Sequence, residues 1–297
     1  MTGPEQGFLL LSSHLGDPER KVLTMAQLRI LGARTQQLDI TEPNRELTDN
    51  DLISLGYDQS TAERILSLLS SSEQLNWYVS KGQRQGIYPI TRVSNTYPKV
   101  LKNVLGLEAP GCLWAKGDVS ILDTPAISLV GSRELSPANR EFAREAGRQA
   151  ALQGFTLVSG NARGADQTAQ EACLAAGGKV ISIVADRLDS HYAQQNVLYL
   201  SEDGFDLDFS TPRALSRNRV IHTLGKITLV AQCALDIGGT WDGTTKNLRY
   251  SWSPVCCFSD GSAAAKELEC RGAQLIGISQ LSQLSDLMEN EQNFIDQ

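Results

Sequence analysis

Between residues 126 and 271, continuous apolar runs rich in β-branched residues alternate with alanine-rich stretches of helical periodicity, and this alternation limits the fold more than any other feature. The apolar runs are predicted as buried strands, at 126–130, 155–159, 179–185, 227–231 and 254–258. Helices are predicted at 137–153, 166–176 and 261–271. Strands that are apolar on both faces and are separated by helices are typical of a parallel sheet covered on both sides. The sequence therefore predicts an α/β fold with an extended Rossmann-like, doubly wound parallel sheet.

The residues before this region have a different pattern. Apolar positions recur at helical spacing over 23–32, and two helices joined by a turn at Gly56 are predicted over 52–69. Such a pair could contact a DNA backbone, but the turn lacks paired glycines, so a helical packing unit is the preferred interpretation. Two further runs, 77–81 and 87–93, have strand-like composition. The expected organisation is a small, mostly helical N-terminal module, a Rossmann-like domain and a C-terminal tail, over residues 1–108, 109–280 and 281–297.

Composition narrows the classes of protein that this chain can belong to. The 297 residues carry a formal net charge of −7, which excludes a surface that is basic throughout but says nothing of a local anion site. The six cysteines form no C-x-x-C pair and only three histidines are present, so no metal site is expected. No apolar run is long enough to span a bilayer. We expect a cytoplasmic protein with reduced cysteines, no membrane segment and no cofactor.

Ligands of doubly wound sheets bind beyond the carboxyl ends of the strands, so the residues that follow each predicted strand are the candidates for function. Glycine and arginine follow both of the first two strands, as Gly131-Ser132-Arg133 and as Ser159-Gly160-Asn161-Ala162-Arg163. Glycine lets a backbone approach a ligand closely, and arginine offers a forked donor for phosphate. The alternative is an ordinary tight turn with a solvated arginine. Asp166, at the start of the next helix, is expected to cap it.

A second group of arginines lies further along the chain. Ser216 is predicted as an N-cap, which places Arg217 and Arg219 in the first turn of a helix, with Asn218 between them. A cation in that turn opposes the helix dipole. A surface salt bridge would account for one of the arginines, whereas a bound phosphate would account for both. We therefore favour an anion site that includes residues 217–219.

The segment from Gly238 to Thr244 follows the fourth strand and is rich in glycine and threonine. It is predicted as a loop in which Gly238, Gly239 and Thr240 form a backbone nest for an anion, and the alternative is a flexible connector. Trp241 within it either stacks on a base or packs on the fold. The dinucleotide fingerprint, a nucleophile elbow and a Walker loop are all absent from the sequence, so no catalytic residue is assigned.

Taken in order, these motifs resemble those of the DNA-processing protein A family, also called DprA or Smf, over about residues 20–278. The resemblance rests on Tyr97-Pro98, Lys116-Gly117, the strand-end motifs, the 217–221 segment and a late Gly272-Ala273. It implies a helical N-terminal module and a Rossmann-like domain that binds single-stranded DNA, in a homodimer that helps to load a RecA-type recombinase during natural transformation. By matching position, the DNA-phosphate site would include Gly131, Ser132, Arg133, Ser159, Gly160, Arg217 and Arg219. Arg163 occupies a variable position, so its inclusion rests on the residues alone.

The sequence also departs from that family. Gln170 stands where the family has histidine, and Ser259-Asp260 where it has Pro-Gly, so single-stranded DNA binding is better supported than RecA loading. The 238–244 segment also resembles a loop of the lysine-decarboxylase-like nucleoside-monophosphate phosphoribohydrolases, whose glutamate would fall at Asn247. An amide cannot act as that carboxylate. A non-enzymatic protein is therefore favoured, and a small-nucleotide sensor or nucleoside-monophosphate hydrolase is the alternative.

Overall fold

The computed structural model describes residues 1–38 and 45–289. Their strands form one nine-stranded sheet in the order β1-β2-β6-β5-β4-β3-β7-β8-β9. The strands are β1 (Ile87–Thr91), β2 (Cys112–Lys116), β3 (Ala126–Val130), β4 (Thr156–Ser159), β5 (Lys179–Ile183), β6 (Val197–Ser201), β7 (Thr228–Val230), β8 (Val255–Phe258) and β9 (Gln274–Ile276). The strands from β3 to β9 pair in parallel, whereas β2 runs antiparallel to both β1 and β6. The predicted α/β, doubly wound sheet is confirmed.

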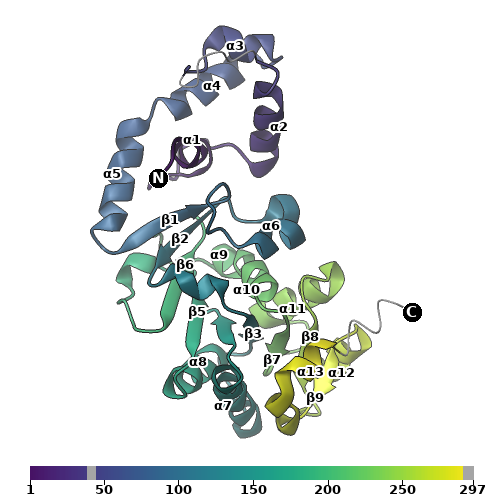
Figure 1. Cartoon of the computed structure of the whole chain (residues 1–297). Coiled ribbons are helices and arrows are strands. Elements are labelled where there is room, and N and C mark those ends of the chain that lie inside the picture. Colours follow the sequence, from purple (N-terminus) through teal and green to yellow (C-terminus); the bar gives the residue numbers. More distant parts are fainter. Residues whose placement is uncertain (39–44, 290–297) are drawn as a thin grey trace.

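Helices cover both faces of this sheet (Figure 1). In chain order they are α1 (Gly3–Ser12), α2 (Met25–Thr35), α3 (Asp49–Ser54), α4 (Gln59–Leu69), α5 (Ser72–Gln83), α6 (Lys99–Leu105), α7 (Pro137–Leu152), α8 (Ala165–Ala175), α9 (Thr211–Ser216), α10 (Asn218–Leu224), α11 (Gly238–Tyr250), α12 (Ala263–Cys270) and α13 (Leu284–Glu289). One core layer joins α7 and α8 to the sheet and includes Phe142 and Cys173. The opposite layer joins α6, α10 and α12 to it and includes Leu101, Ile221 and Leu268.

The first helices lie beyond the β1 edge of the sheet (Figure 1). Helices α2, α3 and α4 share a small apolar core of their own, which includes Leu31, Leu52 and Ile65. The interpretation of residues 52–69 as a helical packing unit agrees with this core. None of the helices in the described part of the chain is both long enough and apolar enough to cross a membrane.

Two predicted segments differ from the structure. Residues 77–81, predicted as a strand, belong to α5, because Leu75, Tyr78 and Val79 are buried at helical spacing and join the core. Residues 238–244, predicted as a loop, form the first turns of α11. Residues 87–91, in contrast, do form a strand, and as β1 they pair with β2.

Candidate functional site

A cavity of about 460 Å³ opens where β3 and β7 end. These two strands are neighbours in the sheet, and β4 lies on the other side of β3 from β7. The direction in which successive strands are added therefore reverses between β3 and β7. Such a switch point leaves a crevice at the carboxyl ends of the strands, because the connections on its two sides cross to opposite faces. The cavity is therefore where the fold class places a ligand.

The structure brings most of the predicted site residues together in this cavity. Those that line it are Gly131, Ser132, Arg133, Arg217, Asn218, Gly238, Gly239 and Thr240. Those that do not are Ser159, Gly160, Arg163 and Arg219. A ligand contact by any of these residues stays a prediction, because the arrangement shows only which side chains share the cavity.

Arg133 supplies a free cation to the cavity. The turn before it is held by Ser132, whose backbone N–H and hydroxyl both donate to the carbonyl oxygen of Gln232, at 2.9 and 3.2 Å. A side chain at Gly131 would collide with the Cβ of Ala165, so the glycine allows α8 to start close to this turn. Among the described residues, the Arg133 guanidinium has no hydrogen bond or ion pair. It can therefore bind an anion without first breaking another contact.

Arg217 lies at the inner wall of the cavity and is only 9% exposed. Its Nη1 donates to the carbonyl oxygen of Ile183 at 2.8 Å, but its buried Nε has no acceptor among the described residues. Burial lowers the pKa of this guanidinium, and the nearby carboxylate of Asp166 opposes that shift. The positive charge of Arg217 at the inner wall favours an anion in the cavity.

Asp166 supports the loop that follows β4. One of its carboxylate oxygens accepts from the backbone N–H groups of Gly160 and Ala162, at 3.0 and 3.2 Å. The prediction that Asp166 caps its helix is wrong, because Gly164 holds the N-cap position of α8 and the carboxylate turns back to the loop. Burial raises the pKa of the Asp166 carboxyl, against the effect of Arg217. The two opposite charges thus attract each other at one side of the cavity.

The first turn of α11 forms another wall of the cavity. The prediction that residues 238–244 form a loop with an anion nest is wrong, because these residues are helical. The N-cap residue of α11 is Ile237, which offers no side-chain acceptor. The first backbone N–H groups of this helix are therefore uncapped, and the positive end of its dipole faces the cavity. Trp241 is buried against the fold, with the Arg271 guanidinium 5.3 Å from its ring centroid.

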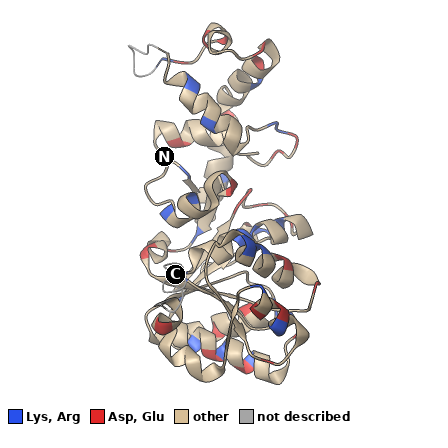
Figure 2. Cartoon of the chain, turned by 90° about the vertical axis from the view of Figure 1, so that its right-hand side faces the viewer, with Lys and Arg blue, Asp and Glu red and all other residues tan. Residues whose placement is uncertain are grey.

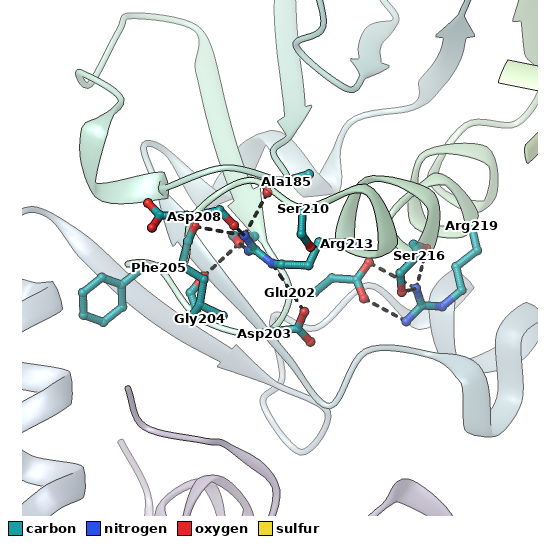
Figure 3. Close-up of polar contacts among 12 residues, drawn as sticks. Ala185, Glu202, Asp203, Gly204, Phe205, Asp208, Ser210, Arg213, Ser216 and Arg219 are labelled. Atoms are coloured by element: carbon teal, nitrogen blue, oxygen red, sulfur yellow. Dashed lines mark hydrogen bonds and ion pairs between the residues drawn. The ribbon is translucent and has the colours of Figure 1, made fainter. Parts of the chain in front are cut away.

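Arg219 lies outside the cavity and has partners of its own (Figure 3). The prediction that Ser216 is an N-cap is wrong: Ser216 is the last residue of α9, and Arg217 itself holds the N-cap position of α10. The Nη2 of Arg219 forms an ion pair with Glu202 at 2.8 Å, and its Nε donates to the carbonyl oxygen of Glu108. The salt bridge that was the alternative thus accounts for Arg219 without an anion.

The position proposed for a hydrolase carboxylate is buried. Asn247 donates from Nδ2 to the Nδ1 of His222 at 3.1 Å and accepts from the backbone N–H of Ser253 at 2.9 Å. It does not line the cavity. His222 does line it, and burial lowers the pKa of this histidine to about 3. This part of the wall is therefore neutral at ordinary pH.

Sequence reasoning missed the outer rim of the cavity. Phe209, Leu215 and Ile237 line it there, and all three side chains are exposed. No periodic pattern marks them, since each stands alone among polar or small residues. Only the fold brings them together.

Comparisons with known proteins agree with this arrangement. The model of a family described as DNA recombination-mediator protein A matches residues 89–287. The DNA processing protein DprA of Bacillus subtilis is 26% identical over 203 residues, which are 64% of this chain and 68% of that protein. The DprA of Streptococcus pneumoniae is 31% identical over 49% of this chain and 54% of its own length. Protein Smf of Escherichia coli is 31% identical over 49% of this chain and 41% of its own length. The matched regions thus span about half the length of these last two relatives.

Solved structures show the same fold. The DprA structure from Streptococcus pneumoniae has a TM-score of 0.71 at 23% identity and covers 96% of this chain and 98% of that one. A structure of DNA processing protein A from Helicobacter pylori, described by its single-stranded DNA binding mode, has a TM-score of 0.56 at 25% identity. It covers 67% of this chain and 96% of that one.

Proposed function

The chain belongs to the DNA recombination-mediator protein A family, and we propose that it binds single-stranded DNA in the cavity where β3 and β7 end. The observation that carries the proposal is that two arginines line one cavity. The Arg133 guanidinium has no hydrogen bond or ion pair with another described residue, and Arg217 lies at the inner wall near Asp166. A DNA phosphate can bind both arginines, because it offers several acceptor oxygens and a negative charge.

The distribution of charge supports a local contact rather than a broad one. Basic and acidic residues are interspersed on the elements seen in Figure 2, and the chain is acidic as a whole. A duplex held by its outer backbone calls for an extended basic face. A cavity with two arginines and an uncapped helix start suits the flexible backbone of a single strand instead. The binding mode named for the Helicobacter pylori relative agrees with this proposal.

We extend the proposal to the finer roles that family membership suggests. The chain acts in DNA processing, uptake or recombination, as a cytoplasmic homodimer that assists a RecA-type recombinase. The description of the family as a recombination mediator supports this role. The phosphate site is proposed to include the cavity residues and Arg163, with Gly160 acting through Arg217.

The charge contact at Arg133 gives the first prediction. We expect Arg133→Ala to weaken oligothymidylate binding for every sequence alike and to flatten the slope of log affinity against log salt by about 0.7, the value for one lost phosphate contact on a single strand. The measurement is fluorescence anisotropy at several salt concentrations. Arg140→Ala is the matched control, because Arg140 is exposed on α7 and does not line the cavity.

Two results would contradict the proposal. One is an Arg133→Ala slope equal to that of the control variant. The other is duplex binding as tight as single-strand binding at moderate salt. A panel of free nucleoside monophosphates belongs in the same experiment, since tighter binding of one of them would favour the nucleotide sensor, and release of free base would favour the hydrolase.

A further inference from the structure

A second cavity, of about 290 Å³, lies in the helical part of the chain that precedes the sheet. It opens between α2 and α4, away from the cavity at the ends of β3 and β7 (Figure 1). Its apolar floor consists of Leu23, Leu31 and Ile65, which belong to the small core that these helices share. Ile30 also lines it and is 45% exposed. The cavity can therefore hold an apolar group of a ligand.

Two arginines line the same cavity, Arg34 from α2 and Arg64 from α4. Neither arginine forms an ion pair within the described part of the chain. The Arg34 guanidinium lies 4.5 Å from the ring centroid of Tyr57, and its Nη1 donates to the carbonyl oxygen of Gly56 at 3.4 Å. The Nη2 of Arg64 donates to the Oε1 of Gln27, also at 3.4 Å. Both hydrogen bonds are long, so each guanidinium can take a charged acceptor in exchange for little.

The balance of charge in this cavity favours an anion. The lining holds the carboxylate of Asp58 beside the two arginines. Asp58 caps α4 and accepts from the backbone N–H and from the hydroxyl of Thr61, both at 2.8 Å. These hydrogen bonds lower the pKa of the Asp58 carboxyl and occupy both of its oxygens. Two positive charges therefore face one negative charge that is already bound, and the cavity as a whole attracts a further anion.

We infer that this cavity binds an acidic segment of a partner protein, with a carboxylate on Arg34 and Arg64 and an apolar side chain on the floor. A carboxylate is flat and has two oxygens, so it matches the fork of a guanidinium. A DNA backbone offers phosphate to the arginines but no apolar group to the floor. The inference goes beyond the proposed function, because it assigns a protein-docking site to a part of the chain that the DNA site does not include.

The test measures binding of a fluorescein-labelled peptide, Gly-Ser-Asp-Ser-Asp-Leu, to the full chain by fluorescence anisotropy. Peptide concentrations should reach about 1 mM, since a small cavity gives a weak affinity. We expect saturable binding that added salt weakens. Replacing leucine by serine should weaken it on the order of tenfold, and removing every carboxylate, with asparagine for aspartate and an amidated end, should abolish it. Peptides that keep only the aspartates, or only the free end, show which carboxylate the arginines hold.

Variants of the cavity residues provide the second arm. Arg34→Gln and Arg64→Gln should each lower the affinity on the order of tenfold, and Arg29→Gln is their matched control, because Arg29 is exposed on α2 and does not line the cavity. Ile30→Ser should also weaken binding. Its matched control is Ile53→Ser, because Ile53 is 42% exposed on α3 and does not line the cavity.

The outcomes decide the inference without reference to the DNA site. Peptide affinities that are equal for the arginine variants and their control, binding that does not depend on the carboxylates, or no binding of any peptide would each overturn it. Displacement of the peptide by oligothymidylate would assign the cavity to DNA and also overturn it. Melting followed by circular dichroism shows whether a variant keeps its fold, and if an arginine variant unfolds, the peptide series and the isoleucine pair still decide. Oligothymidylate affinity should be the same in every variant, so the proposed function can fail or stand independently.

Discussion

Gly160 leaves room for the guanidinium of Arg217. A Cβ at this position would lie 1.5 Å from the Nη1 of Arg217, so no side chain fits unless the arginine moves. Gly160 does not line the cavity, and its backbone N–H is held by Asp166. It therefore affects the cavity through Arg217, which needs this space to keep its donor groups at the inner wall.

We expect Gly160→Ala to push Arg217 out of its place. The overlap should lower the free energy of unfolding by about 1–3 kcal/mol, as overpacking of a filled interior does. Oligothymidylate affinity should fall as well, because Arg217 moves. Gly32→Ala is the matched control: Gly32 lies in α2 with open space around it, so alanine there should raise the unfolding free energy by ~0.5–1 kcal/mol. Equal melting temperatures and affinities for the two variants would contradict the expectation.

Short sequence motifs predict the positions of only some cavity residues. The glycine and arginine that follow a strand pointed to Arg133, which lines the cavity because the end of a parallel strand is a fixed place in the fold, and its phosphate contact stays a prediction. The same reasoning placed Gly160 and Arg163 beside the ligand, but neither lines the cavity. A motif gives the position of a residue along a strand end, whereas the direction in which the loop turns depends on contacts such as that of Asp166.

At the scale of elements, five of the seven strands that pair in parallel were predicted, whereas β6, β9 and α11 were not. The runs at 126–130 and 254–258 correspond to β3 and β8 because continuous apolar composition needs a sheet buried on both faces. Helix α11 begins with two glycines, which disfavour a helix by about 1 kcal/mol each. It forms because Trp241 and Asn247 are buried on it, and this tertiary packing has no local signature in the sequence.

Where α10 meets α11, His222 makes stability depend on pH. Burial lowers the pKa of His222 to about 3, below its ordinary value of 6.5. Since the folded pKa is the lower one, the unfolded chain takes up the proton first, and stability is lost as pH falls from about 6.5 toward 3. By linkage, about 2 kcal/mol of unfolding free energy should be lost between pH 7.5 and 5.

Urea unfolding of the unchanged protein and of His222→Gln at several pH values measures this contribution. The variant removes the titrating group, so the difference in unfolding free energy between the two proteins should shrink as the pH falls. Carboxyl groups titrate in both proteins alike and cancel in that difference. If the difference in unfolding free energy stayed constant from pH 7.5 to 5, His222 would bind its proton equally well in the folded and the unfolded chain, which would contradict the prediction.

At the scale of the whole molecule, the prediction still to be tested is the division into a module over 1–108 and a domain over 109–280. Residues before 109 contribute to the sheet, since β1 pairs with β2 along its length. Tyr97, Leu101 and Leu105 lie in the same core layer as strands β2 to β8. The hydroxyl of Tyr97 donates to the carbonyl oxygen of Pro110 at 2.6 Å, which ties this segment to the start of β2.

The full chain and the fragment 109–289 together test where the folding unit of the sheet begins. The fragment loses Tyr97, Leu101 and Leu105 from one core layer and Tyr78 and Val79 from the other. Each of these buried side chains contributes about 1.5–3 kcal/mol, so their sum is comparable to the ~5–15 kcal/mol that stabilises a typical domain. The fragment also leaves one edge of β2 unpaired and prone to association. We therefore expect the full chain to unfold cooperatively on heating and 109–289 to be unfolded or aggregated, as followed by circular dichroism and light scattering. If the fragment melted cooperatively at the same temperature as the full chain, the boundary near residue 108 would stand and β1 would be an accessory strand.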